Sequence, residues 1–237
     1  MKRIWELDAL RGACILMVIV AHICFDVQGF FGITLPLGAL WYLFDYGGLI
    51  FVLISGISAT LGHHSFHRGV IVFSFGMLIT AISYALIALG WMNPNMKIQF
   101  GVLHLLGVCM MLYPLLKKLP TWALALAGAG IVALGYWFMS FRLQSAVGGD
   151  WRSYLFVFGL ITERFSAGDF FPLCPHLGWF MLGICLGRWL YPQKKSLFPN
   201  APQNHPVWRF FRFCGRHSLE IYLIHQPILF ALFWLMS

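Results

Sequence analysis

Seven long apolar runs constrain this chain more than any other feature of its sequence. They lie near residues 8–29, 39–62, 69–91, 98–116, 120–140, 171–191 and 216–236. Each is close to the ~20 residues that an α-helix needs to cross the ~30 Å hydrocarbon core of a bilayer. The chain is 60% hydrophobic and only 10% charged, which is typical of a polytopic membrane protein. We therefore predict an all-α polytopic membrane protein, with residues 1–237 forming one domain of about seven transmembrane helices.

The number of spans is open at one place. The stretch SYLFVFGLI at residues 153–161 is too short to cross a membrane, and it is re-entrant, interfacial or part of an eighth span. No small-residue cleavage site follows the first apolar run, so we interpret that run as a retained membrane helix and not as a signal peptide.

The distribution of Lys and Arg predicts the orientation of the chain. With a cytoplasmic N-terminus, 12 of the 16 basic residues fall in cytoplasmic segments and 4 in outer segments, as the positive-inside rule requires. We therefore expect a multi-pass protein of the cytoplasmic (inner) membrane. Its net charge of +8 then reflects basic loops and not a nucleic-acid partner. The segment 192–215, in which Arg alternates with aromatic residues near its end, is typical of an interfacial segment on the membrane.

The first apolar run carries three ionisable side chains in a regular spacing. His22 follows Arg11 by eleven residues, so the two share a helix face, with His22 about 16 Å deeper. Asp26 comes one turn after His22 and is spaced to contact its imidazole. Because ionisable groups at mid-membrane depth are costly, they usually mark a functional site. This helix is therefore the first candidate for one.

Three further ionisable residues lie within apolar runs. Asp45 belongs to the second run and His104 to the outer half of the fourth. His225 lies nine residues beyond Arg216, about 13 Å into the last run. His225 is therefore expected at nearly the same depth as His22, with both depths counted from the cytoplasmic side. We predict that Asp45, His104 and His225 line one cavity with His22.

Five strings occur in order along the chain and point to a known family. They are DALRG–ILMV–H–FD in the first run, FVLISGIS in the second, FGVLHLLGV in the fourth, DFFPLCPHLGWFMLGICLG at the sixth and GRHSLEIYLIHQP at the last. Together they resemble bacterial members of the heparan-alpha-glucosaminide N-acetyltransferase catalytic-domain family. The spacing of Arg11 and His22 is also similar to the Arg-x10-His pattern of the acyltransferase-3 family, a relative in the transmembrane acyltransferase superfamily.

The resemblance implies transfer of an acyl group, usually acetyl, from cytoplasmic acyl-CoA to an amino-sugar or other glycan acceptor on the outer side. Such a reaction needs a base, a group that orients the base, and donors for the developing oxyanion. Residues 27–62, past the first run, contain no His, so His22 matches the position that the resemblance to the acyltransferase-3 family implies. His22 is therefore the expected catalytic base and Asp26 the group that orients it. Two routes stay open: His22 takes the acyl group itself, or it acts only as a general base.

The phosphates of CoA need fixed basic partners on the cytoplasmic side. Arg11, at the mouth of the first helix, either binds such a phosphate or pairs with Asp8. The predicted CoA-binding residues are Arg11, Arg68, Lys117, Lys118, Arg188 and Arg216.

No metal is expected, and acetyl-CoA or another acyl-CoA is the one co-substrate. His63, His64 and His67 share a basic loop in which no Cys or carboxylate completes a metal site. The six cysteines are scattered without a CxxC pair. The expected partners are therefore acyl-CoA, the glycan acceptor and the lipid bilayer, and a homodimer is left open.

Two other classes of protein remain as alternatives. A proton-coupled transporter or flippase of a small polar molecule also uses intramembrane charges, although this chain lacks the internal repeat typical of many transporters. A haem protein is the other alternative, although no run holds two histidines spaced for stacked haems.

Two segments give further expectations. The fifth apolar run has no ionisable residue, so we predict that it faces lipid at the edge of the bundle. The outer segment 141–171 mixes charges and aromatic residues, which fits either a lid over a polar acceptor or an ordinary solvated loop.

Overall fold

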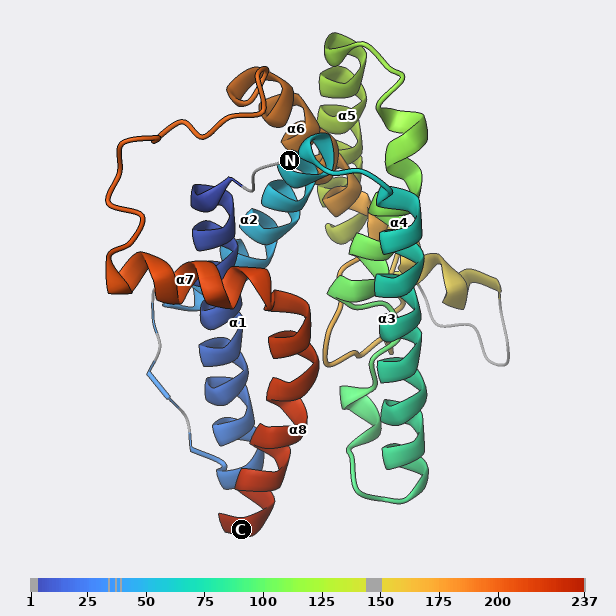
Figure 1. Cartoon of the computed structure of the whole chain (residues 1–237). Helices are drawn as coiled ribbons and strands as arrows, with labels where there is room; N and C mark the ends of the chain where they lie inside the picture. The colour runs from blue at the N-terminus through green and yellow to red at the C-terminus, as the bar shows by residue number, and fades with distance from the viewer. Residues whose placement is uncertain (1–3, 34, 37, 39, 144–150, 237) are drawn as a thin grey trace. The chain divides into compact units, whose positions relative to one another are not determined.

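The structure is a computed structural model that describes residues 4–33, 35–36, 38, 40–143 and 151–236. This part of the chain contains eight α-helices, two 3-10 helices and two isolated β-bridges (Figure 1). The α-helices are α1 (Trp5–Phe31), α2 (Leu40–Leu61), α3 (Ser65–Ala88), α4 (Val102–Leu116), α5 (Thr121–Met139), α6 (Leu173–Leu190), α7 (Pro206–Arg216) and α8 (Ser218–Met236). The 3-10 helices are η1 (Pro94–Met96) and η2 (Trp151–Phe158).

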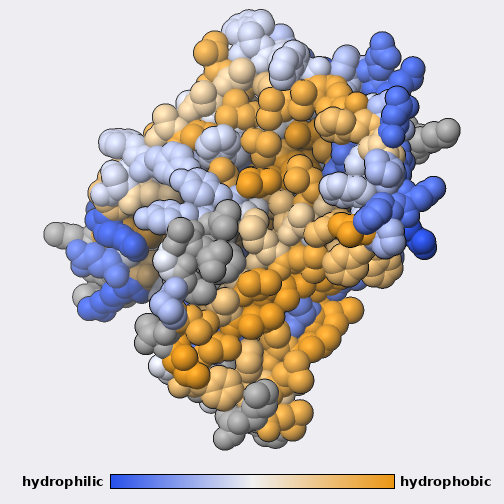
Figure 2. Space-filling model, turned by 90° about the vertical axis from the view of Figure 1, so that its left-hand side faces the viewer, coloured by the Kyte–Doolittle hydropathy of each residue, from blue (hydrophilic) through white to orange (hydrophobic). Residues whose placement is uncertain are grey.

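Each of the seven predicted apolar runs forms an α-helix, namely α1 to α6 and α8, with ends within a few residues of those predicted. Three stretches are long and apolar enough to cross a membrane: Trp5–Gln28, Ser65–Ala88 and Thr121–Met139. Apolar side chains also cover most of the face in Figure 2, with hydrophilic ones gathered toward its edges, as expected for lipid contact. The prediction of an all-helical chain is confirmed, while the count of about seven spans and the cytoplasmic N-terminus stay predictions.

The eighth α-helix, α7, lies where the sequence predicts an interfacial segment. Its 11 residues rise only about 16 Å, so it is too short to cross a bilayer. The short apolar stretch at 153–161 is occupied mainly by the 3-10 helix η2.

The chain divides into two compact units, which we describe separately. The first comprises residues 1–54 and 190–237, and the second comprises residues 55–189. The first unit therefore joins the N-terminal and C-terminal parts of the chain, and helix α2 contributes to both units.

In the first unit, helix α7 lies across α1 (Figure 1). The two backbones approach closely at a pair of glycines. A Cβ atom added at Gly12 would meet the carbonyl oxygen of Phe211, and one added at Gly215 would meet the carbonyl oxygen of Asp8. Because any larger residue collides with backbone there, these two glycines determine where the helices cross.

Helix α8 follows α7 and runs beside α1 in the same direction (Figure 1). The aromatic rings of Phe31 and Phe233 lie 5.7 Å apart near the far ends of the two helices. The C-terminus of α1 is closed by Gly32, whose left-handed backbone (φ 63°) lets its N–H donate to the carbonyl of Gln28.

The start of α1 holds the segment that follows α6. The Glu6 carboxylate accepts hydrogen bonds from the Ser196 hydroxyl and the Leu197 backbone N–H, both at 2.8 Å. The indole N–H of Trp5 donates to the carbonyl of Phe198 at 3.2 Å. These bonds tie the long connection between α6 and α7 to the first turn of α1.

We expect the Glu6→Gln substitution to lower the pKa of Tyr191. Burial, the Glu6 charge and a hydrogen bond to Glu6 raise the pKa of Tyr191 to about 12. Because burial is the largest cause, the pKa should fall but stay above the ordinary value of about 10. The stabilisation that the neutral phenol provides is present below pH ~10 and is lost as the pH rises through 12. Ultraviolet titration of tyrosine, with Tyr191→Phe as the control that removes the signal, measures the change. An unchanged titration in Glu6→Gln would contradict the contact.

In the second unit, small residues let the helices pack closely. A Cβ atom at Gly107 of α4 would lie 2.6 Å from that of Phe73 on α3. One at Gly187 of α6 would lie 3.0 Å from the Cα atom of Ile57 on α2, and one at Gly56 would meet Phe180 and Gly183. The GxxxG pair at 183 and 187 is thus a helix-packing face, as small residues at such spacing predict.

Helix α5 packs within the second unit through Leu124, Gly128 and Gly135. Most of its other large side chains are exposed, with Trp122 at 69% and Trp137 at 61%. This exposed apolar surface fits the prediction that the helix faces lipid.

Candidate active site

The candidate site lies in the first unit, where α1 and α8 bring two histidines together. The imidazole rings of His22 and His225 have centroids 5.0 Å apart, with their planes inclined by 58°. The two histidines therefore lie side by side, and their depth in a membrane stays a prediction. His225 is buried and His22 is half-buried.

The hydrogen bond made by His225 determines its tautomer. Its Nδ1 lies 2.6 Å from the carbonyl oxygen of Tyr222, one turn earlier on α8. Because a carbonyl oxygen only accepts, Nδ1 carries the proton, and the neutral ring keeps its lone pair on Nε2. No hydrogen bond to the His22 ring is found in the part of the chain that the structure describes. Neither ring nitrogen of His22 is therefore committed to a hydrogen bond with a described residue.

A buried carboxylate lies one turn beyond His22. Asp26 is only 4% exposed, and its two oxygens accept from the Nε2 amide of Gln226 at 3.1 and 3.4 Å. Among the described residues the partner of this carboxylate is Gln226 and not His22. The structure thus places Asp26 on the predicted face but pairs it with the neighbouring helix, and its role in orienting His22 stays a prediction.

We expect Gln226→Ala to destabilise the pairing of α1 with α8. The substitution leaves the buried Asp26 carboxylate without its donor, which costs about 1–3 kcal/mol. The double variant Asp26→Ala/Gln226→Ala should regain part of this loss, because no unpaired carboxylate remains. Thermal unfolding of the purified protein measures both changes. Strictly additive losses in the two single variants and the double variant would contradict the pairing.

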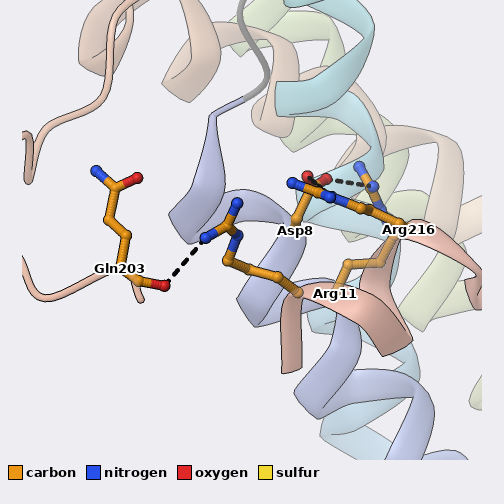
Figure 3. A network of polar contacts seen from close by, with 5 residues as sticks. Asp8, Arg11, Gln203 and Arg216 are labelled. Carbon is orange, nitrogen blue, oxygen red and sulfur yellow. Dashed lines mark hydrogen bonds and ion pairs between the residues drawn. The ribbon is translucent and has the colours of Figure 1, made fainter. Parts of the chain in front are cut away.

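The N-terminal end of α1 and the residues just before α8 carry charged groups. Asp8, only 6% exposed, lies 3.4 Å from Nη1 of Arg11 and 3.5 Å from Nε of Arg216, so one carboxylate lies beside two guanidinium groups (Figure 3). The structure therefore brings together two of the predicted CoA-binding residues. It also shows that Arg11 pairs with Asp8, one of the two roles that the sequence leaves open. Together, the Asp8 carboxylate and the two guanidinium groups keep a net positive charge.

The other predicted CoA-binding residues belong to the second unit. Arg188 donates to the carbonyls of Lys117 and Leu119, each at 2.9 Å, and to the Thr121 hydroxyl at 3.1 Å. It therefore caps the C-terminus of α4 and holds the turn into α5. The predicted roles in CoA binding of Arg68, Lys117, Lys118 and Arg188 stay predictions.

His104 also lies in the second unit, where both of its ring nitrogens have partners. Its Nδ1 accepts from the Gly101 backbone N–H at 3.2 Å, so Nε2 carries the proton and donates to the Thr80 hydroxyl at 3.3 Å. The ring stacks on Phe100 and contacts the edge of Phe73. These contacts organise the N-terminus of α4, and a role for His104 beside His22 stays a prediction. Asp45 lies in α2, but its side chain falls outside the described residues.

The outer segment 141–171 also belongs to the second unit, and its residues 144–150 lie outside the described part of the chain. Its remaining part is held by an aromatic cluster in which the rings of Phe165 and Phe170 lie 4.7 Å apart and Phe156 stacks on Phe165. Asp169 accepts from the backbone N–H of Val102 at the start of α4.

Sequence reasoning missed Gln226 as a site residue. A signal for it was present, because Gln226 is a polar residue inside an apolar run and directly follows His225. It also missed Tyr222, whose contribution is a backbone carbonyl that no side-chain pattern reveals.

Comparison with known families now adds to this geometry. Residues 3–227 match the family model described as heparan-alpha-glucosaminide N-acetyltransferase, catalytic. The chain belongs to this family. The match to the heparan-alpha-glucosaminide N-acetyltransferase family includes α1 and the part of α8 that carries the second histidine. No match was found among curated proteins or among solved structures.

Proposed function

We propose that this protein is a membrane acyltransferase that moves an acetyl group from cytoplasmic acyl-CoA to the amino group of an amino sugar or related glycan on the outer side. The observation that carries the proposal is the pair His22 and His225 on α1 and α8, two helices whose cytoplasmic ends carry Arg11 and Arg216. Membership of the acetyltransferase family supports the same conclusion. We also propose that the N-terminus is cytoplasmic and that about seven helices cross the membrane.

The distance between the basic mouth at Arg11 and the imidazole of His22 suits this reaction. Along α1, His22 lies about 16 Å from Arg11 by helical rise, roughly half of a ~30 Å hydrocarbon core. Basic residues at the mouth bind the phosphates of CoA, and its long flexible arm carries the thioester toward the histidines. The acceptor approaches the same point from the other side, so neither substrate has to cross the whole membrane.

The reaction needs one proton acceptor, and His22 provides it. The amine nitrogen of the acceptor attacks the thioester carbonyl, and its proton passes to the imidazole of His22. The carbon–sulfur bond breaks, the thiolate of CoA takes that proton, and the thiol leaves. His225 packs against His22 with its own ring fixed by the Tyr222 carbonyl, and we propose that it positions His22 and helps to keep it neutral.

The proposal is tested by release of free CoA thiol from acetyl-CoA with detergent-purified protein. Glucosamine is the probe acceptor, and N-acetylglucosamine, whose amine is already blocked, is the matched control. We expect release that glucosamine stimulates and N-acetylglucosamine does not, with an acetylated product found by mass spectrometry. Absence of stimulated release with any free amino sugar, together with uptake of the sugar into proteoliposomes, would instead support the transporter alternative.

A further inference from the structure

A second polar feature of the first unit is a cavity at helix α7, which shares only Arg216 with the proposed CoA-binding mouth. Its volume is about 320 Å³. It is lined by Asn204, Arg209, Arg212, Phe213, Arg216 and His217. Three guanidinium groups therefore border one small space.

The spacing of the arginines explains why they meet there. Arg209, Arg212 and Arg216 stand three and four residues apart, so they form one stripe along the helix. Two carboxylates lie near this stripe. Asp8 pairs with Nε of Arg216 at 3.5 Å, and Glu220 lies 3.8 Å from Nδ1 of His217. The positive charges thus outnumber the negative ones, and the cavity is suited to an anion.

The guanidinium of Arg212 is only partly satisfied. Its Nη1 donates to the carbonyl of Gln203 at 3.0 Å, which fixes the group in place. Its Nε is buried and has no hydrogen-bond partner among the described residues. Leaving a buried charged donor without an acceptor is costly, so this nitrogen indicates an acceptor that the protein itself does not provide. The Arg209 side chain likewise makes no hydrogen bond or ion pair within the described part.

An apolar face adjoins the cavity on the same helix. Val207, Phe210 and Phe213 stand three residues apart and are 49%, 55% and 59% exposed. On the same helix, Gly215 is buried against α1 and Cys214 is buried as well. Phe213 belongs to both features, because it lines the cavity and is exposed beside it. A ligand that fills both has an anionic head and an apolar tail.

We propose that α7 binds an anionic phospholipid, with the headgroup phosphate in the arginine cavity and the acyl chains along Phe210 and Phe213. Guanidinium groups bind phosphate through paired, charge-assisted hydrogen bonds. A short helix with a basic stripe beside an aromatic face lies in the plane of the membrane surface, and α7 leads directly into the apolar helix α8. The proposal does not depend on the acyltransferase reaction.

The test is thermal unfolding of the detergent-purified full chain titrated with phosphatidylglycerol or with phosphatidylcholine. We expect stabilisation by phosphatidylglycerol only. Each basic residue near an anionic surface contributes about a factor of five in affinity, so Arg209→Gln should weaken the apparent Kd about fivefold and the double variant with Arg212→Gln about thirtyfold. Lys195→Gln, which removes an exposed charge from the preceding connection, is the matched control and should bind as the wild type does.

Separate arms identify the source of the phosphate. Inorganic phosphate and CoA are added alone and in competition with phosphatidylglycerol. Neither should displace the lipid, because neither has acyl chains to cover the aromatic face. The proposal is overturned if phosphatidylcholine stabilises the protein equally, if Arg209→Gln binds phosphatidylglycerol as the wild type does, or if CoA displaces the lipid. If the double variant does not fold, Arg209→Gln alone still decides the test. This variant should fold, because the Arg209 side chain makes no hydrogen bond or ion pair with the described residues.

Discussion

The His22→Ala variant should lose acceptor-stimulated release of CoA, with a rate about 10²–10⁴-fold below that of the wild type. The physical reason is that an amine attacking a thioester must give up a proton. In the first unit His22 is the half-buried imidazole to which no described residue is hydrogen-bonded. The thiol-release measurement with glucosamine gives the rate, and acetyl-CoA binding by the variant shows that the loss is in the chemical step.

The matched control for this variant is His67→Ala. His67 is an exposed histidine in the first turn of α3, far along the chain from the candidate site. Its removal should leave the release rate unchanged. Survival of stimulated release in His22→Ala would move the base to another histidine, with His225 and then His104 tested next.

The two chemical routes through His22 are separated by trapping. Labelled acetyl-CoA is mixed with the protein without an acceptor, and the protein is denatured and separated. Label on the wild type that is absent from His22→Ala would indicate an acyl-histidine intermediate. A wild type that carries no label would favour the general-base role.

The second large effect is expected at the crossing of α1 and α7. Replacing Gly215 by Ala puts a methyl group onto the carbonyl oxygen of Asp8 and within 2.9 Å of the Gly12 backbone nitrogen. Since neither group is a flexible side chain, the helices must separate, and we expect a destabilisation of about 1–3 kcal/mol or more. The shift should also lower activity, because Arg216 follows directly and pairs with Asp8.

Gly130→Ala is the matched control for this substitution. Gly130 lies within α5, and a Cβ atom added there meets nothing within 4 Å. The same change of residue type should therefore be neutral or stabilise the protein by about 0.5–1 kcal/mol, because Ala is the better helix former. Thermal unfolding followed by tryptophan fluorescence compares the two. A Gly215→Ala protein that unfolds at the same temperature as the wild type would contradict the close contact between the α1 and α7 backbones.

The helices of this fold follow from the sequence because each depends on a local pattern. An apolar run of about 20 residues specifies a helix whatever it packs against. The alternation of Arg and aromatic residues before the last run likewise predicts the interfacial segment in which α7 lies. The close approach of His22 and His225 agrees with the helical rise counted from Arg11 and Arg216.

The partners within the site could not be predicted in this way. Spacing along one helix pairs Asp26 with His22, whereas its observed partner Gln226 lies 200 residues away on another helix. Which face of α8 meets α1 is decided by packing between the helices, and a single sequence does not report that. His104 illustrates the same limit, because its two partners come from a backbone N–H and from a side chain on α3.

The first unit is built from the two ends of the chain, with the second unit inserted between them. During synthesis, α1 is made before the second unit, and α8 with His225 and Gln226 is made after it. A nascent or truncated chain therefore holds His22 without the helix that packs beside it. The candidate site can therefore assemble only after the whole second unit has been made, and under the proposed function a chain that stops earlier has no organised centre at which acetyl-CoA could be lost by hydrolysis.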